Sequence, residues 1–190
     1  MAAQPSGTIL VLCTGNICRS PYIERVLAHE LRDTDIRVES AGTRALAGYP
    51  IHASSAARLQ SSGVASEDFA ARQLTVDLIR WADLIIGATR DHIGGAAQLN
   101  PAALRKGFAL LDLADLLDGV NDDEIARAPG ANRVAQVAAE ALARRAEVSP
   151  RTPQGATIAD PYQQDESVFD AMATQVGDAV PIVAGALRGH

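Results

Sequence analysis

Cysteine is scarce in this sequence, and its scarcity excludes a secreted fold held together by disulfides. The 190-residue chain has two cysteines, Cys13 and Cys18, only five positions apart. Two such residues cannot form a disulfide framework, so a reducing compartment is expected. No basic residue precedes Ile9, and the apolar run from Ile9 to Cys13 is too short for a signal sequence or a membrane span. We therefore expect a cytoplasmic protein without membrane insertion.

An excess of positive charge is also missing, since the formal net charge is -6 at pH 7. A protein that mainly binds nucleic acid or an anionic membrane usually carries the opposite sign, so no nucleic-acid partner is expected. Hydrophobic residues make up 47% of the chain and charged residues 21%, an ordinary globular composition. The length suffices for one domain with a buried core. We predict a single domain over residues 1–190.

Two kinds of segment alternate along the chain. Apolar runs rich in branched residues, such as 8–13, are typical of strands buried on both faces of a parallel sheet, and between them apolar residues recur at helical spacing. The predicted strands are 8–13, 36–40, 84–88 and 108–111. The first predicted helix starts at Ser20-Pro21. Further helices are predicted at 53–62, 75–81, 113–117, 134–145 and 165–187, and Pro181 is expected to kink or interrupt the last of them. This order predicts an α/β fold with a four-stranded parallel sheet flanked by helices.

The string Cys13-Thr14-Gly15-Asn16-Ile17-Cys18-Arg19-Ser20 follows the first predicted strand and precedes a helix. Ligands bind at this end of the strands in open α/β sheets. Backbone N–H groups ahead of a helix N-terminus, together with the helix dipole, make an oxyanion site. The string therefore predicts a phosphate-binding loop after the first strand, in which the substrate contacts Thr14, Gly15, Asn16, Ile17, Cys18 and Ser20.

Cys13 and Arg19 give this loop its chemistry. The loop donors and the Arg19 guanidinium favour the thiolate form of Cys13, which is a nucleophile. Arg19 can contact two phosphate oxygens at once, which a lysine cannot do. We expect Gly15 to permit the backbone dihedrals of the turn, while the side chains of Asn16 and Ser20 tie the loop together or donate to the thiolate.

Other kinds of site fit this string less well. It lacks both the nucleotide P-loop motif and the dinucleotide fingerprint. A zinc site on Cys13 and Cys18 would need two further ligands, and the four histidines lie at spacings without a zinc signature; they are His29, His52, His92 and His190. Ordinary core cysteines would be the default for either residue alone. The agreement of strand, loop and helix start favours the phosphate loop, so neither metal nor cofactor is expected.

The segment Cys13 to Pro21 resembles the complete signature loop of the low-molecular-weight protein tyrosine phosphatases. Further matches follow in the family's order, at Ser40-Ala41-Gly42-Thr43, Gly48 with Pro50, Ala71-Arg72, Asp83-Leu84-Ile85-Ile86 and Asp160-Pro161-Tyr162. The resemblance implies catalysis without a metal through a phosphocysteine intermediate. It also implies the role of each residue: Cys13 as nucleophile, Arg19 as transition-state clamp, Asn16 and Ser20 as loop supports, and Asp160 as general acid.

Asp160 also fits the chemistry of phosphate esters, since one carboxyl group can protonate the leaving oxygen and later activate water. By itself, however, an Asp-Pro pair indicates a turn or a helix cap more often than catalysis. Only the family's order, with Asp160-Pro161-Tyr162 just before the final predicted helix, favours the catalytic role.

Three departures from the family's pattern concern the substrate pocket and one long segment. Relatives that favour phosphotyrosine commonly have an aromatic residue where this chain has Leu46, and many have a second aromatic where it has Gln163. Leu46 and Tyr162 are thus expected to line the pocket, with modest selectivity for aryl groups. An extended segment at about 119–157 is longer than in compact relatives. Its acidic patch at 122–124 is simply interpreted as a helix start and its alanine-rich part as a packed helix.

The expected function is a phosphatase acting on phosphotyrosine or similar aryl phosphates. Arsenate reduction on the same fold is an alternative, because arsenate mimics phosphate. No cysteine follows Cys18, so such an enzyme would need a small external thiol, and Asp160 argues against it because arsenate has no ester leaving group. An inactive phosphoprotein-binding module is a further alternative, disfavoured by the presence of Cys13, Arg19 and Asp160 together.

Overall fold

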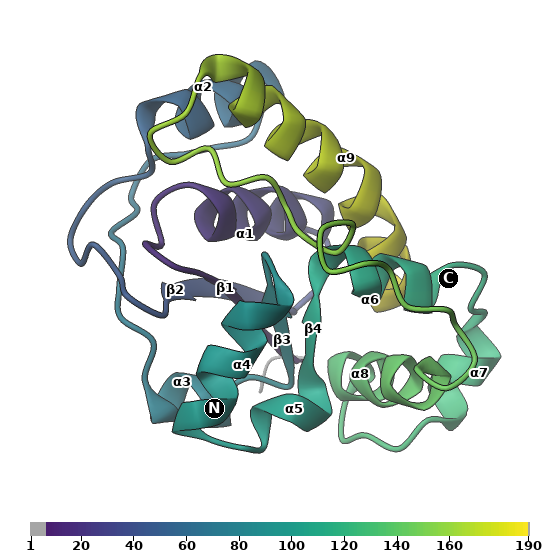
Figure 1. Cartoon of the computed structure of the whole chain (residues 1–190). Coiled ribbons are helices and arrows are strands. Elements are labelled where there is room, and N and C mark those ends of the chain that lie inside the picture. Colours follow the sequence, from purple (N-terminus) through teal and green to yellow (C-terminus); the bar gives the residue numbers. More distant parts are fainter. Residues whose placement is uncertain (1–6, 190) are drawn as a thin grey trace.

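A four-stranded sheet forms the centre of the molecule in the computed structural model, which describes residues 7–189 (Figure 1). Residues 1–6, part of the leader in which no signal sequence was expected, and His190 lie outside the described part. The strands are β1 (Thr8–Cys13), β2 (Arg37–Gly42), β3 (Leu84–Gly87) and β4 (Gly107–Ala109), in the order β2-β1-β3-β4. All neighbouring strands are parallel, which confirms the predicted fold class.

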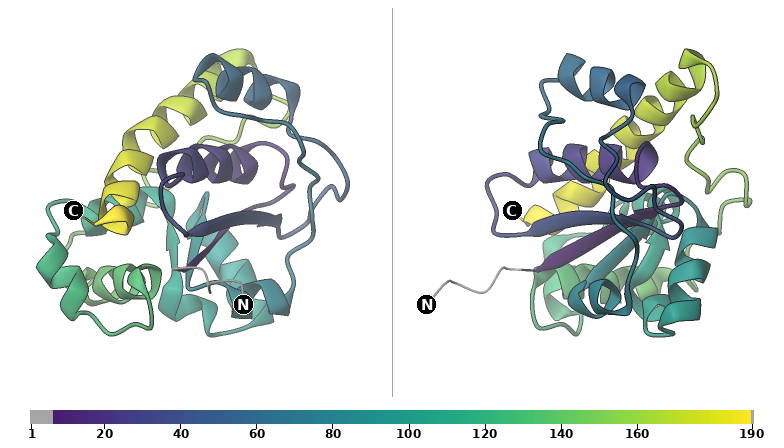
Figure 2. Two further views of the ribbon diagram at one scale, coloured as in Figure 1. Left: turned by 180° about the vertical axis from the view of Figure 1, so that it is seen from behind. Right: turned by 90° about the vertical axis from the view of Figure 1, so that its left-hand side faces the viewer.

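Alternate residues of β1 face two separate cores, and this explains its continuous apolar sequence. Ile9 and Val11 face one core, while Leu10 and Leu12 face the other, and all four are fully buried. The first core is completed by α1 (Arg19–Glu30), α2 (Ala53–Ser61), α6 (Leu110–Leu117), α7 (Asp122–Arg127), α8 (Arg133–Arg144) and α9 (Glu166–Arg188). The second is completed by α3 (Val76–Trp81), α4 (Arg90–Leu99) and α5 (Ala103–Lys106). Figure 2 shows α1 and α9 on one side of the sheet.

Strand β4 is shorter than predicted, because Leu110 and Leu111 begin α6 instead of extending the strand. Six of the eight residues of α6 are buried, and its polar face consists of only two residues, Asp112 and Asp115, which is too little to mark this apolar run as a helix from its sequence. A short run of this kind is equally typical of a buried strand and a buried helix. Helix α4 was not predicted at all, and β2 lies further along the chain than the predicted 36–40.

Two further boundaries differ from the prediction. Helix α1 begins at Arg19 with Cys18 as its N-cap, so Ser20 lies inside the first turn and its hydroxyl is free for the loop. Helix α9 continues through Pro181, so of the two expected effects of this proline, a kink or an interruption, the interruption does not occur. Val180 and Val183 on either side of the proline are fully buried, and their packing holds this part of the helix together.

The extended segment folds into α7 and α8, which lie beside the β4 edge of the sheet in Figure 1. The acidic patch begins α7, as predicted, and Asn121 and Glu124 cap that helix reciprocally, each side chain accepting the other residue's backbone N–H. Helix α8 places its buried residues in the same core as α9, which confirms the packed alanine-rich helix. Within residues 7–189, no helix is long and apolar enough to cross a membrane.

Candidate active site

The carboxyl end of β1 opens into a pocket of about 330 Å³. Its lining brings together almost all of the predicted site residues from distant parts of the chain: Cys13, Thr14, Gly15, Ile17, Cys18, Arg19, Leu46, Asp160 and Tyr162. Arg44 also lines the pocket and was missed by the sequence analysis. Asn16 and Ser20, although they belong to the loop, do not line the pocket, because both residues are fully buried.

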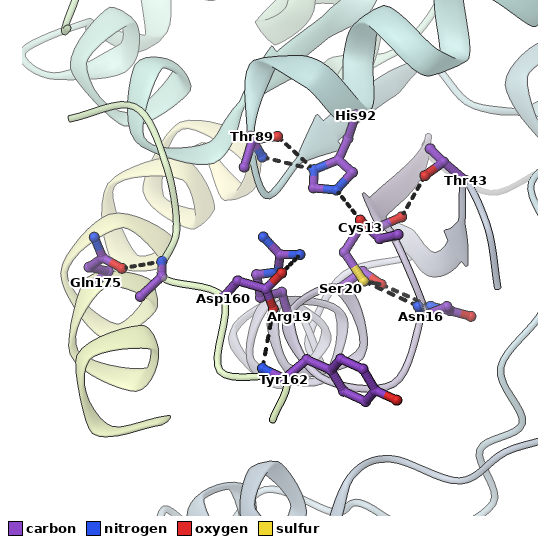
Figure 3. Close-up of polar contacts among 12 residues, drawn as sticks. Cys13, Asn16, Arg19, Ser20, Thr43, Thr89, His92, Asp160, Tyr162 and Gln175 are labelled. Atoms are coloured by element: carbon purple, nitrogen blue, oxygen red, sulfur yellow. Dashed lines mark hydrogen bonds and ion pairs between the residues drawn. The ribbon is translucent and has the colours of Figure 1, made fainter. Parts of the chain in front are cut away.

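The Cys13 sulfur lies at the centre of the loop and is nearly inaccessible, with 2% of the residue exposed (Figure 3). The backbone N–H of Asn16 donates to Sγ over 3.2 Å, and the Ser20 hydroxyl lies 3.0 Å from it. Ser20 Oγ already accepts a hydrogen bond from the Asn16 amide, so its own proton is available to the sulfur. Two donors are thus aimed at one sulfur atom.

Asn16 holds the loop together from behind. Its Nδ2 donates to the hydroxyls of Ser20 (2.9 Å) and Ser40 (2.8 Å), and its Oδ1 accepts the backbone N–H of Arg72 over 2.9 Å. The loop support predicted for Asn16 thus has a geometric basis. Asn16 is also the loop residue with a left-handed backbone (φ 56°), whereas Gly15 is not, so the prediction that Gly15 supplies the unusual dihedrals is wrong.

The segment that follows β2 is joined to the loop by backbone hydrogen bonds. The carbonyl groups of Cys13, Thr14 and Gly15 accept the N–H groups of Thr43, Arg44 and Leu46, over 2.9, 3.0 and 2.9 Å. This close approach requires Gly42, since a Cβ atom there would lie 2.5 Å from the Thr14 carbonyl oxygen. The segment thereby places Arg44 and Leu46 at the pocket rim.

Arg19 and Asp160 form an ion pair inside the pocket. Arg19 Nη2 donates to Asp160 Oδ2 over 2.7 Å, and Asp160 Oδ1 accepts the backbone N–H of Tyr162 over 3.3 Å. The arginine is buried, whereas the aspartate side chain is 53% exposed. A phosphate group entering the pocket would meet both the guanidinium and the carboxyl group.

The residues just before Asp160 are fixed to two other elements. The N–H of Ile158 donates to the carbonyl of Ala88, at the end of β3, over 2.9 Å. Gln175 of α9 contacts the same segment twice: its Oε1 accepts the N–H of Ala159 (2.8 Å), and its Nε2 donates to the Thr157 carbonyl (3.2 Å), the first of these contacts being drawn in Figure 3. No local sequence signal marked Gln175 as part of the site.

His92 of α4 contacts the phosphate-binding loop at Thr14. In the sequence, His92 was considered only as a metal ligand. Its Nδ1 accepts the backbone N–H of Thr89 over 3.1 Å, so Nε2 carries the proton and donates to Thr14 Oγ1 over 3.1 Å (Figure 3). Burial and the nearby Arg19 charge lower the pKa of His92 to about 4. The imidazole is therefore neutral at physiological pH and serves as a fixed donor to Thr14.

Cys18 differs from Cys13 in its electrostatic surroundings. Burial, and then the negative charges of Cys13 and Asp160, raise the pKa of Cys18 to about 12. Cys18 therefore remains a neutral thiol at physiological pH. Among residues 7–189, no group of three or more His, Cys, Asp or Glu side chains is placed to hold a metal ion; His190, one of the candidate zinc ligands, lies outside this range.

Comparisons with known proteins agree with this geometry. A family model described as low molecular weight phosphotyrosine protein phosphatase matches residues 8–126. The Escherichia coli K12 protein named low molecular weight protein-tyrosine-phosphatase Etp is 40% identical over 101 residues, which cover 53% of this chain and 67% of Etp. The Erwinia amylovora protein named probable low molecular weight protein-tyrosine-phosphatase AmsI is 37% identical over 99 residues, which cover 52% of this chain and 67% of AmsI.

Solved structures extend the similarity to nearly the whole chain. Vibrio vulnificus Wzb in complex with benzylphosphonate superposes with a TM-score of 0.68 at 26% identity, covering 94% of this chain and 97% of Wzb. The crystal structure of Erwinia amylovora tyrosine phosphatase AmsI gives a TM-score of 0.66, also at 26% identity, and covers 95% and 92% of the two chains.

Proposed function

This chain belongs to the low molecular weight phosphotyrosine protein phosphatase family, and from that premise we propose that it hydrolyses phosphotyrosine or similar aryl phosphates through a phosphocysteine on Cys13. One observation carries the assignment of roles. The Cys13 sulfur lies between two hydrogen-bond donors in a pocket that also presents the Arg19 guanidinium and the Asp160 carboxyl group. Nucleophile, anion clamp and proton donor thus face one small volume.

In the first step, the Cys13 thiolate attacks phosphorus, the S–P bond forms and the P–O bond to the aryl group breaks. Asp160 gives its proton to the departing oxygen, so a neutral phenol leaves. Arg19 exchanges its ion pair with Asp160 for two phosphate oxygens, which stabilises the equatorial negative charge of the transition state. The same exchange frees the Asp160 carboxyl group to face the departing oxygen.

In the second step, the Asp160 carboxylate accepts a proton from water, which attacks the phosphorus of phosphocysteine. The S–P bond breaks, inorganic phosphate forms, and the thiolate returns to the donors from Asn16 and Ser20. Those donors do not have to reorganise between the steps, because both come from buried groups.

An aryl group is the substrate portion that best fits the rim of the pocket. Leu46 and Tyr162 are partly exposed apolar side chains that line it, 38% and 46% exposed, and a flat ring can lie between them. The benzylphosphonate bound by Vibrio vulnificus Wzb likewise joins an aromatic ring to a phosphorus group. A single aromatic wall supports only modest selectivity for aryl esters, as the sequence indicates.

A cytoplasmic location is part of the same proposal. Both cysteines are free thiols in the structure, and the proposed chemistry requires Cys13 to stay reduced. Phosphotyrosine in proteins or small aryl phosphates would be the partners, without nucleic acid.

Parallel rate measurements test this function. The purified chain is given a phosphotyrosine peptide in one assay and arsenate with glutathione in the other. We expect release of inorganic phosphate from the peptide and no thiol-dependent formation of arsenite. Arsenite formation at a rate comparable to peptide hydrolysis would assign the site to arsenate reduction. Phosphopeptide binding without any turnover would identify a binding module.

A further inference from the structure

A second cavity, of about 420 Å³, lies between α4, β4, α6 and residues 145–151. It shares no lining residue with the catalytic pocket and is larger. Its volume falls in the range of small-molecule sites. Most of its wall is apolar, formed by Ile93, Leu104, Phe108, Leu116, Val148 and Pro150.

Two carboxylates line this cavity, but both are already engaged. Arg90 binds Asp112 with two hydrogen bonds, of 2.7 and 2.8 Å, and Arg151 binds Asp115 in the same way, with 2.6 and 2.7 Å. Every carboxylate oxygen therefore accepts a guanidinium N–H. A cationic ligand would have to compete with these pairs, so the cavity offers little to positive charge.

Arg145 is the third arginine of the cavity, and no carboxylate within residues 7–189 forms an ion pair with it. Its Nη2 donates to the Gly107 carbonyl over 2.7 Å and its Nη1 to the Leu104 carbonyl over 3.4 Å, while the guanidinium lies 4.3 Å from the centre of the Phe108 ring. A guanidinium has five N–H donors, so several remain unused. Burial against this wall lowers the pKa of Arg145, and nearby Asp112 opposes that shift only in part. The lining thus has one positive charge in excess and surplus donors beside an apolar wall.

We propose that this cavity is a binding site for a small organic monoanion that has an aromatic or aliphatic body and one carboxylate. The body would lie against the apolar wall and the carboxylate would accept hydrogen bonds from Arg145. Arg145, Val148 and Pro150 all belong to the extended segment at 119–157. The proposal thereby gives a role to a part of the chain that the phosphatase chemistry does not use.

A pair of probes with the same phenylpropyl body, one ending in a carboxylate and the other in a neutral hydroxymethyl group, tests the proposal. 4-Phenylbutyrate and the neutral 4-phenylbutan-1-ol are titrated separately into the full-length 15N-labelled chain, with inorganic phosphate present to occupy the catalytic loop. We expect backbone amide shifts at Gly94, Gly107 and Ser149, and a dissociation constant about tenfold lower for the carboxylate, as one charge-assisted hydrogen bond implies. Equal affinities, or no shifts at these amides up to the solubility limit, would overturn the proposal.

A matched pair of glycine variants locates the site. A Cβ atom on Gly94 of α4, which lines the cavity, meets no atom within 4 Å, and the same holds for Gly177 of α9, which does not line it. Gly94→Phe should fill the mouth of the cavity and abolish 4-phenylbutyrate binding, whereas Gly177→Phe should leave it unchanged. Binding that survives in Gly94→Phe would contradict the assignment.

The Arg145→Gln variant tests the contribution of the Arg145 charge separately from that of the apolar wall. It should weaken binding of the carboxylate about tenfold and leave binding of the alcohol unchanged. Equal weakening of both would show that Arg145 only shapes the wall, and would overturn the proposed carboxylate contact. If loss of the Gly107 contact prevents this variant from folding, the two probes and the glycine pair still decide the question.

Discussion

The phosphate-binding loop and the segment that carries Asp160 meet at one pocket, but they are held by different kinds of contact. The loop at 13–20 is fixed by buried groups, above all Asn16 and Ser20, which are fully inaccessible. The Asp160 segment is partly exposed, and three contacts hold it: the Arg19 ion pair, the Ala88 carbonyl and the Gln175 side chain. In the proposed mechanism, one of these contacts, the ion pair, breaks when substrate binds.

This difference corresponds to two tasks. In the proposed mechanism the loop presents the same donors to a thiolate, a transition state and a phosphocysteine, so a rigid, buried arrangement is an advantage. In the proposed mechanism Asp160 changes its proton and its partner in each turnover, and its 53% exposed side chain allows both. We therefore expect changes in the loop to remove catalysis for all substrates, and changes in the Asp160 segment to act according to the leaving group.

The largest effect is expected at the centre of the loop, for Cys13→Ser. The serine hydroxyl stays protonated and is a poor nucleophile, so turnover should fall below detection, by on the order of 10⁵-fold or more. Vanadate binding should persist, because Arg19 and the loop donors are unchanged. Isothermal titration with vanadate and a phosphotyrosine peptide assay measure the two properties. Appreciable turnover in the serine variant would exclude the covalent mechanism.

Arg19→Lys tests whether geometry or charge matters at the clamp. Lysine keeps the charge but loses the planar pair of donors, so we expect a loss of on the order of 10³-fold, close to that of Arg19→Ala. The loss should be similar for esters with good and poor leaving groups, since the clamp acts on phosphate oxygens common to both. A lysine variant with a rate near that of the unmodified chain would contradict the clamp role.

For Asp160→Asn, in contrast to Arg19→Lys, we expect a loss of rate that depends on the leaving group. If this carboxyl group protonates the leaving oxygen, the rate on phosphotyrosine should fall by on the order of 10²–10⁴. An ester of a strongly acidic phenol, such as 4-nitrophenyl phosphate, leaves without help and should lose much less. Pre-steady-state release of the phenol measures the first step directly. An equal loss on both esters would make Asp160 structural, with Asp165 the nearest other candidate in the sequence.

The same contrast explains how much of the site could be predicted from the sequence. The loop was readable because its strand, turn and helix start are contiguous and its main donors, Asn16 and Ser20, lie within seven positions of Cys13. The Asp160 segment was identified only by resemblance, because Arg19, its partner, lies 141 positions away. Gln175 and His92 carry no local signal at all, since their importance arises where α9 and α4 approach the pocket.

Some parts of the fold could likewise be predicted from the sequence, and others could not. Strand β1 was predicted to the residue, because its sequence is apolar on both faces and ends at polar loop residues. The boundary between β4 and α6 could not be predicted, since Leu110 and Leu111 are buried in either form and only tertiary packing decides between them. Composition likewise carried no information on the cavity that residues 145–151 form with β4 and α6.

The burial of His92 beside the loop can be tested through the pH dependence of the unfolding free energy. Its folded-state pKa of about 4 lies below the unfolded value near 6.5, so its contribution to stability is full above pH 6.5 and is lost as pH falls toward 4. The unmodified chain should lose about 2 kcal/mol more unfolding free energy between pH 7.5 and 5 than His92→Gln does. Urea titrations at the two pH values measure this difference. His29→Gln, an exposed control, should behave like the unmodified chain, and an identical pH dependence in His92→Gln would contradict the assigned burial effect.

The smallest expected effect, and the sharpest test of the comparison, concerns Gln175. Gln175→Leu keeps the size of the side chain but removes both hydrogen bonds to the segment before Asp160. A less well positioned acid should slow the reaction of phosphotyrosine about tenfold and leave 4-nitrophenyl phosphate nearly unchanged. Gln136→Leu on α8, which removes a glutamine contact to the Ala126 carbonyl, is the matched control and should change neither rate. In the Asp160→Asn background, Gln175→Leu should cost nothing further, because the group that it positions is gone. A loss of equal size on both esters, or a full additional loss in the double variant, would show that Gln175 supports the fold in general. The phosphate-binding loop and the Asp160 segment would then not differ in the way proposed.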